Sequence, residues 1–171
     1  DEPAEDKTEE VKQLVQSAKP LPSFVTCMPR KSVIESFFGA EICAVAAQKF
    51  DPEFKRNAEQ NGKRVWVYNG QRPFTGSFVI DDVAVAMRVN PLLQYLYKIE
   101  RWFYWESTYY MNWQGKESNI NVFVNPRNFS NRYGDSMNGD GLLFYPGTDF
   151  VFESENLNLD RPIPSIRLKN W

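Results

Sequence analysis

The sequence holds no histidine among its 171 residues, and this limits the chemistry that its side chains can do. Histidine is a common ligand of zinc and the usual general base beside serine and cysteine nucleophiles. Imidazole-based metal sites and Ser-His or Cys-His pairs are therefore excluded, and catalysis would use carboxylates, tyrosines, lysines or the two cysteines. No glycine-rich phosphate loop occurs either, which disfavours a nucleotide-binding protein. We expect no cofactor and no metal.

The two cysteines, Cys27 and Cys43, lie in apolar segments. The favoured interpretation is that both are small buried hydrophobic residues. A disulfide between them is the alternative, and it requires that their two strands are neighbours. A reactive thiol is disfavoured, because neither cysteine has an activating base near it in the sequence.

Aromatic residues are unusually concentrated in one part of the chain. Phe, Tyr and Trp make up 15% of the sequence. Nine of them fall between positions 95 and 113: Tyr95, Tyr97, Trp102, Phe103, Tyr104, Trp105, Tyr109, Tyr110 and Trp113. Composition alone favours a role in filling the core. The alternative is a set of flat faces on which a sugar ring or another planar ligand stacks.

Size and charge restrict the class of protein further. The length suits one domain, and 20 basic against 22 acidic residues leave a net charge of −2, which argues against a nucleic-acid partner. No apolar run approaches the ~18–20 residues that a membrane-spanning helix needs, so no membrane span is expected.

Helices and short apolar strands alternate along most of the chain. Alternation of this kind predicts an α/β protein with a parallel sheet. Hydrophobic periodicity and capping residues predict helices over 8–18 and 51–60. A further helical stretch is predicted after Asp82. Pro91 is expected to split it into a short piece and a second helix that ends at about Ile99. Apolar, β-branched segments predict strands over 23–28, 41–47, 63–68 and 101–106. A short strand over 142–145 follows, and the stretch 161–168 is expected to enter a last helix.

The segment from 107 to 140 has a different composition. It contains seven asparagines and little apolar periodicity, so we expect one long Asn-rich loop. Asn128-Phe129-Ser130 within it matches the pattern for N-glycosylation, which predicts a glycan on Asn128 and a secreted, extracellular or lumenal protein.

Three stretches, in this order, resemble glycoside hydrolase family 123 in the C-terminal half of its catalytic barrel. They cover most of the chain, and positions 107–137 match least. The stretches are Asp1-Glu2-Pro3 with the helix after it, then 63–68 with Val79-Ile80-Asp81, Arg88 and the 102–105 aromatics, and finally 139–147 with 162–168. The third stretch is the most specific.

The resemblance implies the C-terminal half of a TIM-like (β/α)8 barrel, in which the four predicted strands are strands five to eight. A whole barrel needs about 250 residues. The resemblance therefore implies that positions 1–171 form a single partial barrel domain and a fragment of a longer chain. The missing N-terminal half, or other protein chains, would then be partners.

The resemblance also implies a reaction. The family cuts β-linked N-acetylgalactosamine with the substrate's own acetamido oxygen as nucleophile, an exception to the usual pair of separated carboxylates. Glu2 would be the general acid and then the base for water, and Asp1 would hold the acetamido N–H. Tyr68, Trp66, Tyr104, Trp105 and Asp140 would bind the sugar.

Simpler interpretations of these residues stay open. The two acids are also what a solvated chain end before a helix would carry, Trp66 would also suit a core, and Asp140 between two glycines would suit a turn. The competing function is a non-catalytic relative, a structural or carbohydrate-binding component of an extracellular assembly. A departure from the family pattern, Lys169 in place of an acid, keeps it open.

Overall fold

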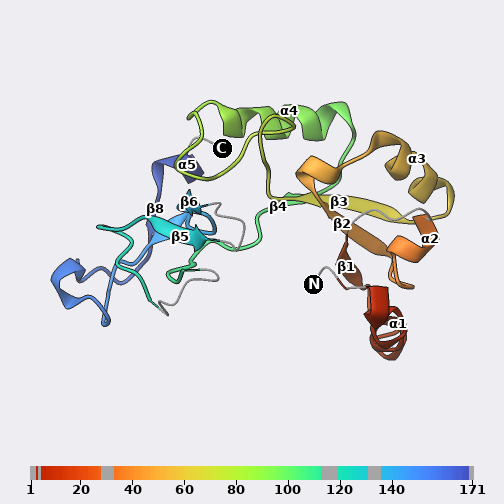
Figure 1. Cartoon of the computed structure of the whole chain (residues 1–171), viewed down its shortest axis with the longest axis horizontal. Helices are drawn as coiled ribbons and strands as arrows, with labels where there is room; N and C mark the ends of the chain where they lie inside the picture. The colour runs from red at the N-terminus through yellow and green to blue at the C-terminus, as the bar shows by residue number, and fades with distance from the viewer. Residues whose placement is uncertain (1–2, 4, 28–32, 113–118, 131–135, 170–171) are drawn as a thin grey trace. The chain divides into compact units, whose positions relative to one another are not determined.

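A computed structural model describes residues 3, 5–27, 33–112, 119–130 and 136–169 of the chain (Figure 1). The chain divides into two compact units. Unit 1 comprises Asp1–Thr75 and Pro91–Phe103, and unit 2 comprises Gly76–Asn90 and Tyr104–Trp171. Each unit is described by itself.

Unit 1 is built on a four-stranded parallel sheet. Its strands are β1 (Phe24–Cys27), β2 (Ile42–Ala46), β3 (Arg64–Tyr68) and β4 (Trp102–Phe103), and they lie side by side in their order along the chain. All three pairings are parallel, with Val25 opposite Cys43, Ala44 opposite Trp66, and Val67 opposite Trp102. The predicted strands and the mixed α/β class are therefore confirmed.

Helical segments precede β1 and connect the strands. They are a 3-10 turn (Glu5–Lys7) and α1 (Thr8–Ser17) before β1, α2 (Val33–Ser36) between β1 and β2, and a second 3-10 turn (Ala47–Lys49) with α3 (Pro52–Gln60) between β2 and β3. Asp51 caps α3, because its carboxylate accepts a hydrogen bond from the Glu53 N–H at 2.8 Å. Gly62, with φ of +68°, ends the turn after the helix.

The helix before β4 differs from the expectation. A 3-10 turn (Ala86–Arg88) leads directly into α4 (Val89–Leu96), and Pro91 is the third residue of that helix rather than a break in it. Proline is tolerated in a first turn because the N–H that it lacks has no intrahelical partner there. The helix ends at Leu96 instead of Ile99, since Lys98 adopts φ of +52° and the Ile99 N–H bonds back to the Gln94 carbonyl.

The two faces of the sheet pack differently. Side chains that alternate along β2 and β3 place Cys43, Val45, Val65 and Val67 in one buried cluster with residues of α3, the turn after α2 and the segment before β4. The other face carries Ala44, Ala46 and Tyr68, with Trp66 and Phe103 packed on them. One face is thus a helix-covered core, and the other is rich in aromatic rings.

Cys43 is fully buried and disulfide-bonded. The favoured interpretation, a reduced buried thiol, is therefore wrong for this residue. Cys27 is the only other cysteine of the sequence and lies on β1, which pairs with β2; its side chain is outside the described part of the structure.

Unit 2 is built from short antiparallel pairs. Strand β5 (Arg127–Ser130) pairs with β6 (Ser136–Asn138), and β7 (Phe144–Tyr145) pairs with β8 (Ile163–Pro164). A 3-10 turn (Glu153–Glu155) lies between β7 and β8, and α5 (Ile166–Lys169) follows. The segment 107–140, expected to be one loop, therefore contains a two-stranded sheet, and Thr108 forms a further bridge to Leu142. None of the described helices is long and apolar enough to cross a membrane.

Candidate functional site

The residues predicted to form the site fall into three groups. Asp1 and Glu2, the predicted catalytic acids, lie outside the described residues. Trp66 and Tyr68 belong to unit 1, and the remaining sugar-binding candidates, Tyr104, Trp105 and Asp140, belong to unit 2. The structure brings the members of this last group together.

Tyr68 lies at the carboxyl end of β3, the edge where parallel α/β sheets place their ligands. It is 6% exposed, and its ring stacks on Phe103 with 5.5 Å between the centroids and an angle of 20°. Its ring therefore belongs to the aromatic face of the sheet, with Ala44 and Ala46 beside it.

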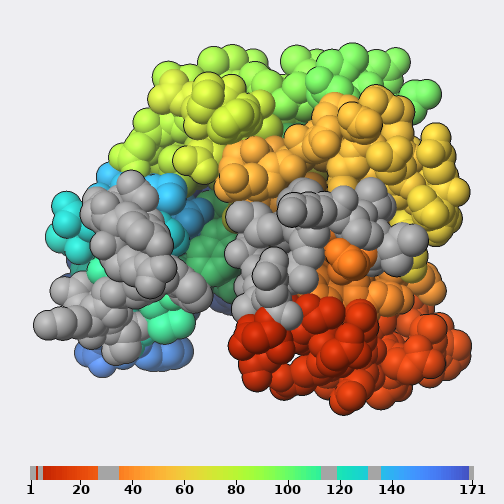
Figure 2. All heavy atoms as spheres, turned by 45° about the vertical axis from the view of Figure 1, so that its right-hand side comes forward, coloured from red at the N-terminus to blue at the C-terminus, as the bar shows by residue number. Residues whose placement is uncertain are grey.

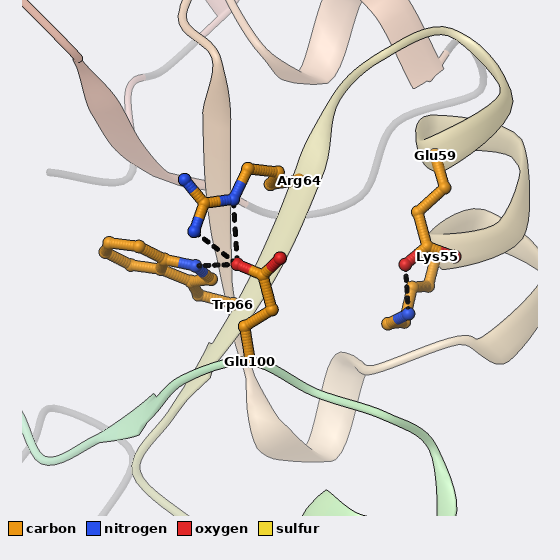
Figure 3. Close-up of polar contacts among 5 residues, drawn as sticks. All are labelled: Lys55, Glu59, Arg64, Trp66 and Glu100. Atoms are coloured by element: carbon orange, nitrogen blue, oxygen red, sulfur yellow. Dashed lines mark hydrogen bonds and ion pairs between the residues drawn. The ribbon is translucent and has the colours of Figure 1, made fainter.

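Trp66 lies on the same face of the sheet as Tyr68, but it contacts different residues (Figure 3). Its Nε1 donates to Glu100, which precedes β4, and the guanidinium of Arg64, at the start of β3, donates to the same carboxylate oxygen. The guanidinium groups of Arg64 and Arg101 lie 5.6 and 5.5 Å from the ring centroid of Trp66. These partners stand at the amino ends of the strands, so Trp66 has a packing role there.

The Arg64–Glu100 pair is held electrostatically. Hydrogen bonding from Arg64 lowers the pKa of Glu100, and the hydrogen bond from Trp66 and the Arg64 charge act in the same direction, while partial burial opposes them. Both side chains are about half exposed, so the ion pair contributes little to stability. Nearby, Lys55 pairs with Glu59 one turn along α3 (Figure 3).

In unit 2 the carboxylate of Asp140 organises two aromatic side chains. Its Oδ1 accepts hydrogen bonds from the Tyr104 hydroxyl at 2.7 Å and from the Trp105 Nε1 at 3.1 Å. The Tyr104 oxygen in turn accepts from the Gly141 N–H at 2.7 Å. These bonds form a closed ring of contacts between the residues after β4 and the Gly139-Asp140-Gly141 turn.

The glycines of that turn are required by geometry. Gly139 and Gly141 have φ of +69° and +70°, which disfavours any side chain. At Gly141 a Cβ would also come within 2.7 Å of the Trp105 ring. The glycines therefore let the turn approach Trp105 closely, which explains the spacing Gly-Asp-Gly without a ligand.

Asn128, the predicted glycan acceptor, is fully buried behind the turn. Its Nδ2 donates to the main-chain carbonyl of Asp140 and, at 3.3 Å, to that of Tyr109. A glycan on Nδ2 would break this arrangement and would have no room. The structure therefore disfavours modification at Asn128 and gives the residue a supporting role beneath Asp140.

Arg167 is a residue of the site region that sequence reasoning missed. It is 9% exposed, and its guanidinium donates to the carbonyls of Phe78, Leu142 and, at 2.9 Å, Gly139. It thus ties three separate segments together around the Asp140 turn. The only signal in the sequence is that Arg167 falls within the stretch 162–168 of the family resemblance.

The electrostatics of this cluster define its possible chemistry. Burial raises the pKa of Tyr104 above its usual range, and the charge of Asp140 and the hydrogen bond to it act in the same direction. Tyr104 is therefore a neutral donor at ordinary pH, not a base. Asp140 Oδ2 accepts no hydrogen bond that the structure records among the described residues, so it can accept one from a ligand hydroxyl.

An aromatic surface adjoins Asp140. The rings of Trp105 and Tyr109 lie 4.9 Å apart at 54°, and both side chains are partly exposed. Glu106 folds back on the chain and accepts from the Ser107 and Thr108 N–H groups, which lowers its pKa. The site thus combines a carboxylate acceptor with partly exposed indole and phenol rings.

Two other features of the described residues bear on ligand binding. No group of carboxylates and cysteines there is placed to hold a metal ion. A cavity of about 160 Å³ in unit 1 is lined mostly by apolar side chains, among them Phe50, Val67 and Trp102, and its polar lining residues are Gln48, Thr75 and Tyr97.

Comparison with models of known protein families and with curated protein sequences finds no match to this chain. The assignment of function therefore depends on the residues themselves.

Proposed function

We propose that the chain is the C-terminal half of a glycoside hydrolase barrel of the family 123 type, acting on β-linked N-acetylhexosamine. The observation that carries the proposal is the order of the sheet in unit 1, in which β1 to β4 lie parallel and in sequence. Adjacent strands of a (β/α)8 barrel have this order, and closure needs four more strands. A longer protein that contains this chain would supply them.

The proposed reaction uses no histidine. The acetamido oxygen of the substrate attacks the anomeric carbon as the bond to the leaving oxygen breaks, and Glu2 gives that oxygen its proton. Asp1 accepts the acetamido N–H and stabilises the cyclic oxazolinium-like intermediate. Water then attacks the anomeric carbon and gives its proton to Glu2, which restores both the acetamido group and the acid. Two adjacent carboxyl groups favour different protonation states, which suits these two roles.

Features of both units support a sugar ligand. Tyr68 lies at the carboxyl edge of the sheet, where barrel enzymes bind substrate. In unit 2, Asp140 Oδ2 and the Trp105–Tyr109 pair offer an acceptor and an aromatic surface. Trp66 is left out of the sugar-binding residues proposed in unit 1, because its contacts are at the amino edge of the sheet.

A secreted or lumenal location fits the disulfide of Cys43, because disulfides persist mainly in oxidising compartments. The glycan on Asn128 is not part of the proposal, since that side chain is buried.

The test is turnover of a chromogenic β-N-acetylgalactosaminide by the protein expressed from its complete gene. We expect wild type to release the chromophore and Glu2→Gln to lose at least about 100-fold in kcat, the usual contribution of a general acid. Glu9→Gln, the same change at an exposed residue of α1, should retain full activity. Equal release of the chromophore by wild type and Glu2→Gln, or no release by either, overturns the proposal that the protein is a hydrolase.

Binding without turnover would favour the second candidate, a non-catalytic carbohydrate-binding component. The Asp140–Trp105 hydrogen bond favours it independently of the acids. Titration with N-acetylgalactosamine should change tryptophan fluorescence in wild type, and Asp140→Asn should weaken the response. The matched control is Asp160→Asn, which changes an exposed residue with no place in this cluster.

A further inference from the structure

A cavity in unit 1 extends from the surface to the core of the sheet. Its volume is about 160 Å³. Val67 and Trp102, both buried, form its inner end. Phe74 and Tyr97, both exposed, lie at its mouth. The gold atoms of α3 and the green atoms of α4 and the segment after it adjoin one another at the surface in Figure 2. The cavity is therefore open to a small molecule from outside.

The cavity lies on the helix-covered face of the sheet, near its carboxyl edge. Ala47 and Gln48, which follow β2 directly, line it, and so does Thr75 in the loop after β3. Open α/β sheets place ligands just outside the carboxyl ends of their strands. Val67 belongs to the helix-covered core, whereas Tyr68 is on the aromatic face. The cavity is therefore separate from the residues proposed to bind a sugar, and a ligand in it is independent of the proposed sugar-cleaving activity.

Size, charge and aromatic content select the kind of ligand. An engineered apolar cavity of about 150 Å³ in another protein binds benzene, so this cavity has room for one six-membered ring. The rings of Phe50 and Tyr97 lie 5.4 Å apart at 60° in its wall, and an aromatic ligand packs well against rings placed edge to face. None of the described residues that line the cavity carries a charge, so a charged ligand would be left unpaired there. These properties together favour a neutral compound with a single aromatic ring.

Gln48 adds a requirement for a hydrogen-bond donor on the ligand. Its Oε1 is buried and accepts no hydrogen bond from the described residues. A buried acceptor without a donor is costly, and the last torsion of a glutamine side chain is broad. The carboxamide can therefore turn so that Oε1 faces a donor in the cavity. Thr75 offers less, because its hydroxyl oxygen already accepts from the Gln71 N–H at 2.8 Å.

We propose that this cavity binds a neutral aromatic compound of one ring that carries a hydrogen-bond donor, such as a phenol. The ring occupies the space between Phe50, Tyr97 and Trp102, and its hydroxyl donates to Gln48 Oε1. Binding thus gives the buried oxygen a partner that the described residues do not supply.

The test is a titration of the complete, ¹⁵N-labelled protein with phenol and with toluene, which has nearly the same shape and no donor, followed by NMR. Phenol should give saturable shifts of the Trp102 indole N–H, which donates to the Asn69 carbonyl at 2.6 Å, and of the amides of residues 47–50 and 97–102. Water solvates phenol better than toluene, so an apolar cavity without an acceptor selects toluene. We therefore expect wild type to bind phenol at least as tightly as toluene.

The decisive variant is Gln48→Leu. It should weaken the binding of phenol relative to toluene by about tenfold, because the hydroxyl then has no acceptor. Binding of toluene by this variant shows that the cavity is intact. Gln60→Leu, the same change at an exposed residue at the end of α3, should leave both affinities unchanged. The proposal is overturned if wild type shows no saturable shifts with phenol, if wild type prefers toluene, or if Gln48→Leu leaves the ratio of the two affinities unchanged.

Discussion

Tyr104 links the buried part of unit 2 to a charged carboxylate. Its hydroxyl donates to Asp140 and accepts from the Gly141 N–H, and burial with the nearby negative charge raises its pKa. The neutral phenol is therefore the form that the folded state stabilises. This contribution is present below the pKa of an unfolded tyrosine, about 10, and is lost as pH rises above it.

We predict a corresponding pH dependence of stability. Above pH 10, Tyr104 should reduce the free energy of unfolding by about 1.4 kcal/mol per pH unit, because the unfolded chain then releases a proton that the folded chain keeps. Tyr104→Phe should remove this part of the dependence of the unfolding free energy on pH, as measured by urea denaturation at several pH values between 9 and 12. Tyr95→Phe, which removes an exposed phenol, is the control. Parallel slopes for wild type and Tyr104→Phe would contradict the prediction.

Asn128 allows a second test at the scale of one residue. Asn128→Asp keeps the shape of the side chain, but replaces an amide that donates to two carbonyls with a carboxylate in a fully buried place. We expect a loss of about 3 kcal/mol in the free energy of unfolding at pH 7. Asn125→Asp is the matched control, because Asn125 is exposed and its Oδ1 accepts from Arg127, which aspartate can also do. Equal stability of the two variants would show that Asn128 has no supporting role.

The sequence predicts that Tyr104, Trp105 and Asp140 bind a sugar, and this stays a prediction. In the structure Tyr104 and Trp105 both donate hydrogen bonds to Asp140. Arg167 was missed because its partners, from Phe78 to Leu142, lie far from it in the sequence and are main-chain atoms. A carbonyl acceptor leaves no side-chain signature, so no pattern of residue types can point to it.

At the scale of elements, local signals were read correctly where local forces decide the structure. Asp51-Pro52-Glu53 predicted the start of α3, and the cap hydrogen bond is present. Pro91 predicts a break, but α4 starts two residues before it. The position of a proline relative to a helix start depends on where the preceding turn ends, which the sequence alone does not state.

The cap of α3 gives a prediction at this scale. Asp51→Ala should lower the free energy of unfolding by about 1 kcal/mol, because the Glu53 N–H loses its acceptor. Asp51→Ser, which can still cap, should retain most of the stability, as measured by urea denaturation. If alanine and serine were equivalent at this position, the cap would not contribute.

At the scale of the whole molecule, the order of the parallel sheet could be expected from the sequence and the division into two units could not. Continuous apolar strands separated by helices lead to parallel neighbours by general rules of connection. The antiparallel pairs β5–β6 and β7–β8 consist of two to four residues a strand, too short for a period of two to be read. The disulfide of Cys43 likewise depends on the pairing of strands, which is a long-range property.

Each unit has its own buried clusters, so each should respond to its own substitutions. Cys43 belongs to the core of unit 1, and Leu142 is fully buried in a separate cluster of unit 2 with Ile120 and Val122. Cys43→Ala should cost about 2–4 kcal/mol through loss of the disulfide. Leu142→Ala should cost about 2–5 kcal/mol through the cavity that it leaves.

Native-state hydrogen exchange distinguishes local from global effects. In Cys43→Ala we expect faster exchange of the amides in β2 and β3, with the amides of residues 136–145 unaffected. In Leu142→Ala we expect faster exchange of the amides of residues 136–145, with those of β2 and β3 unaffected. This follows because a unit with its own core can open without the other. Uniform acceleration of both sets of amides in both variants would mean that the chain unfolds as one cooperative structure.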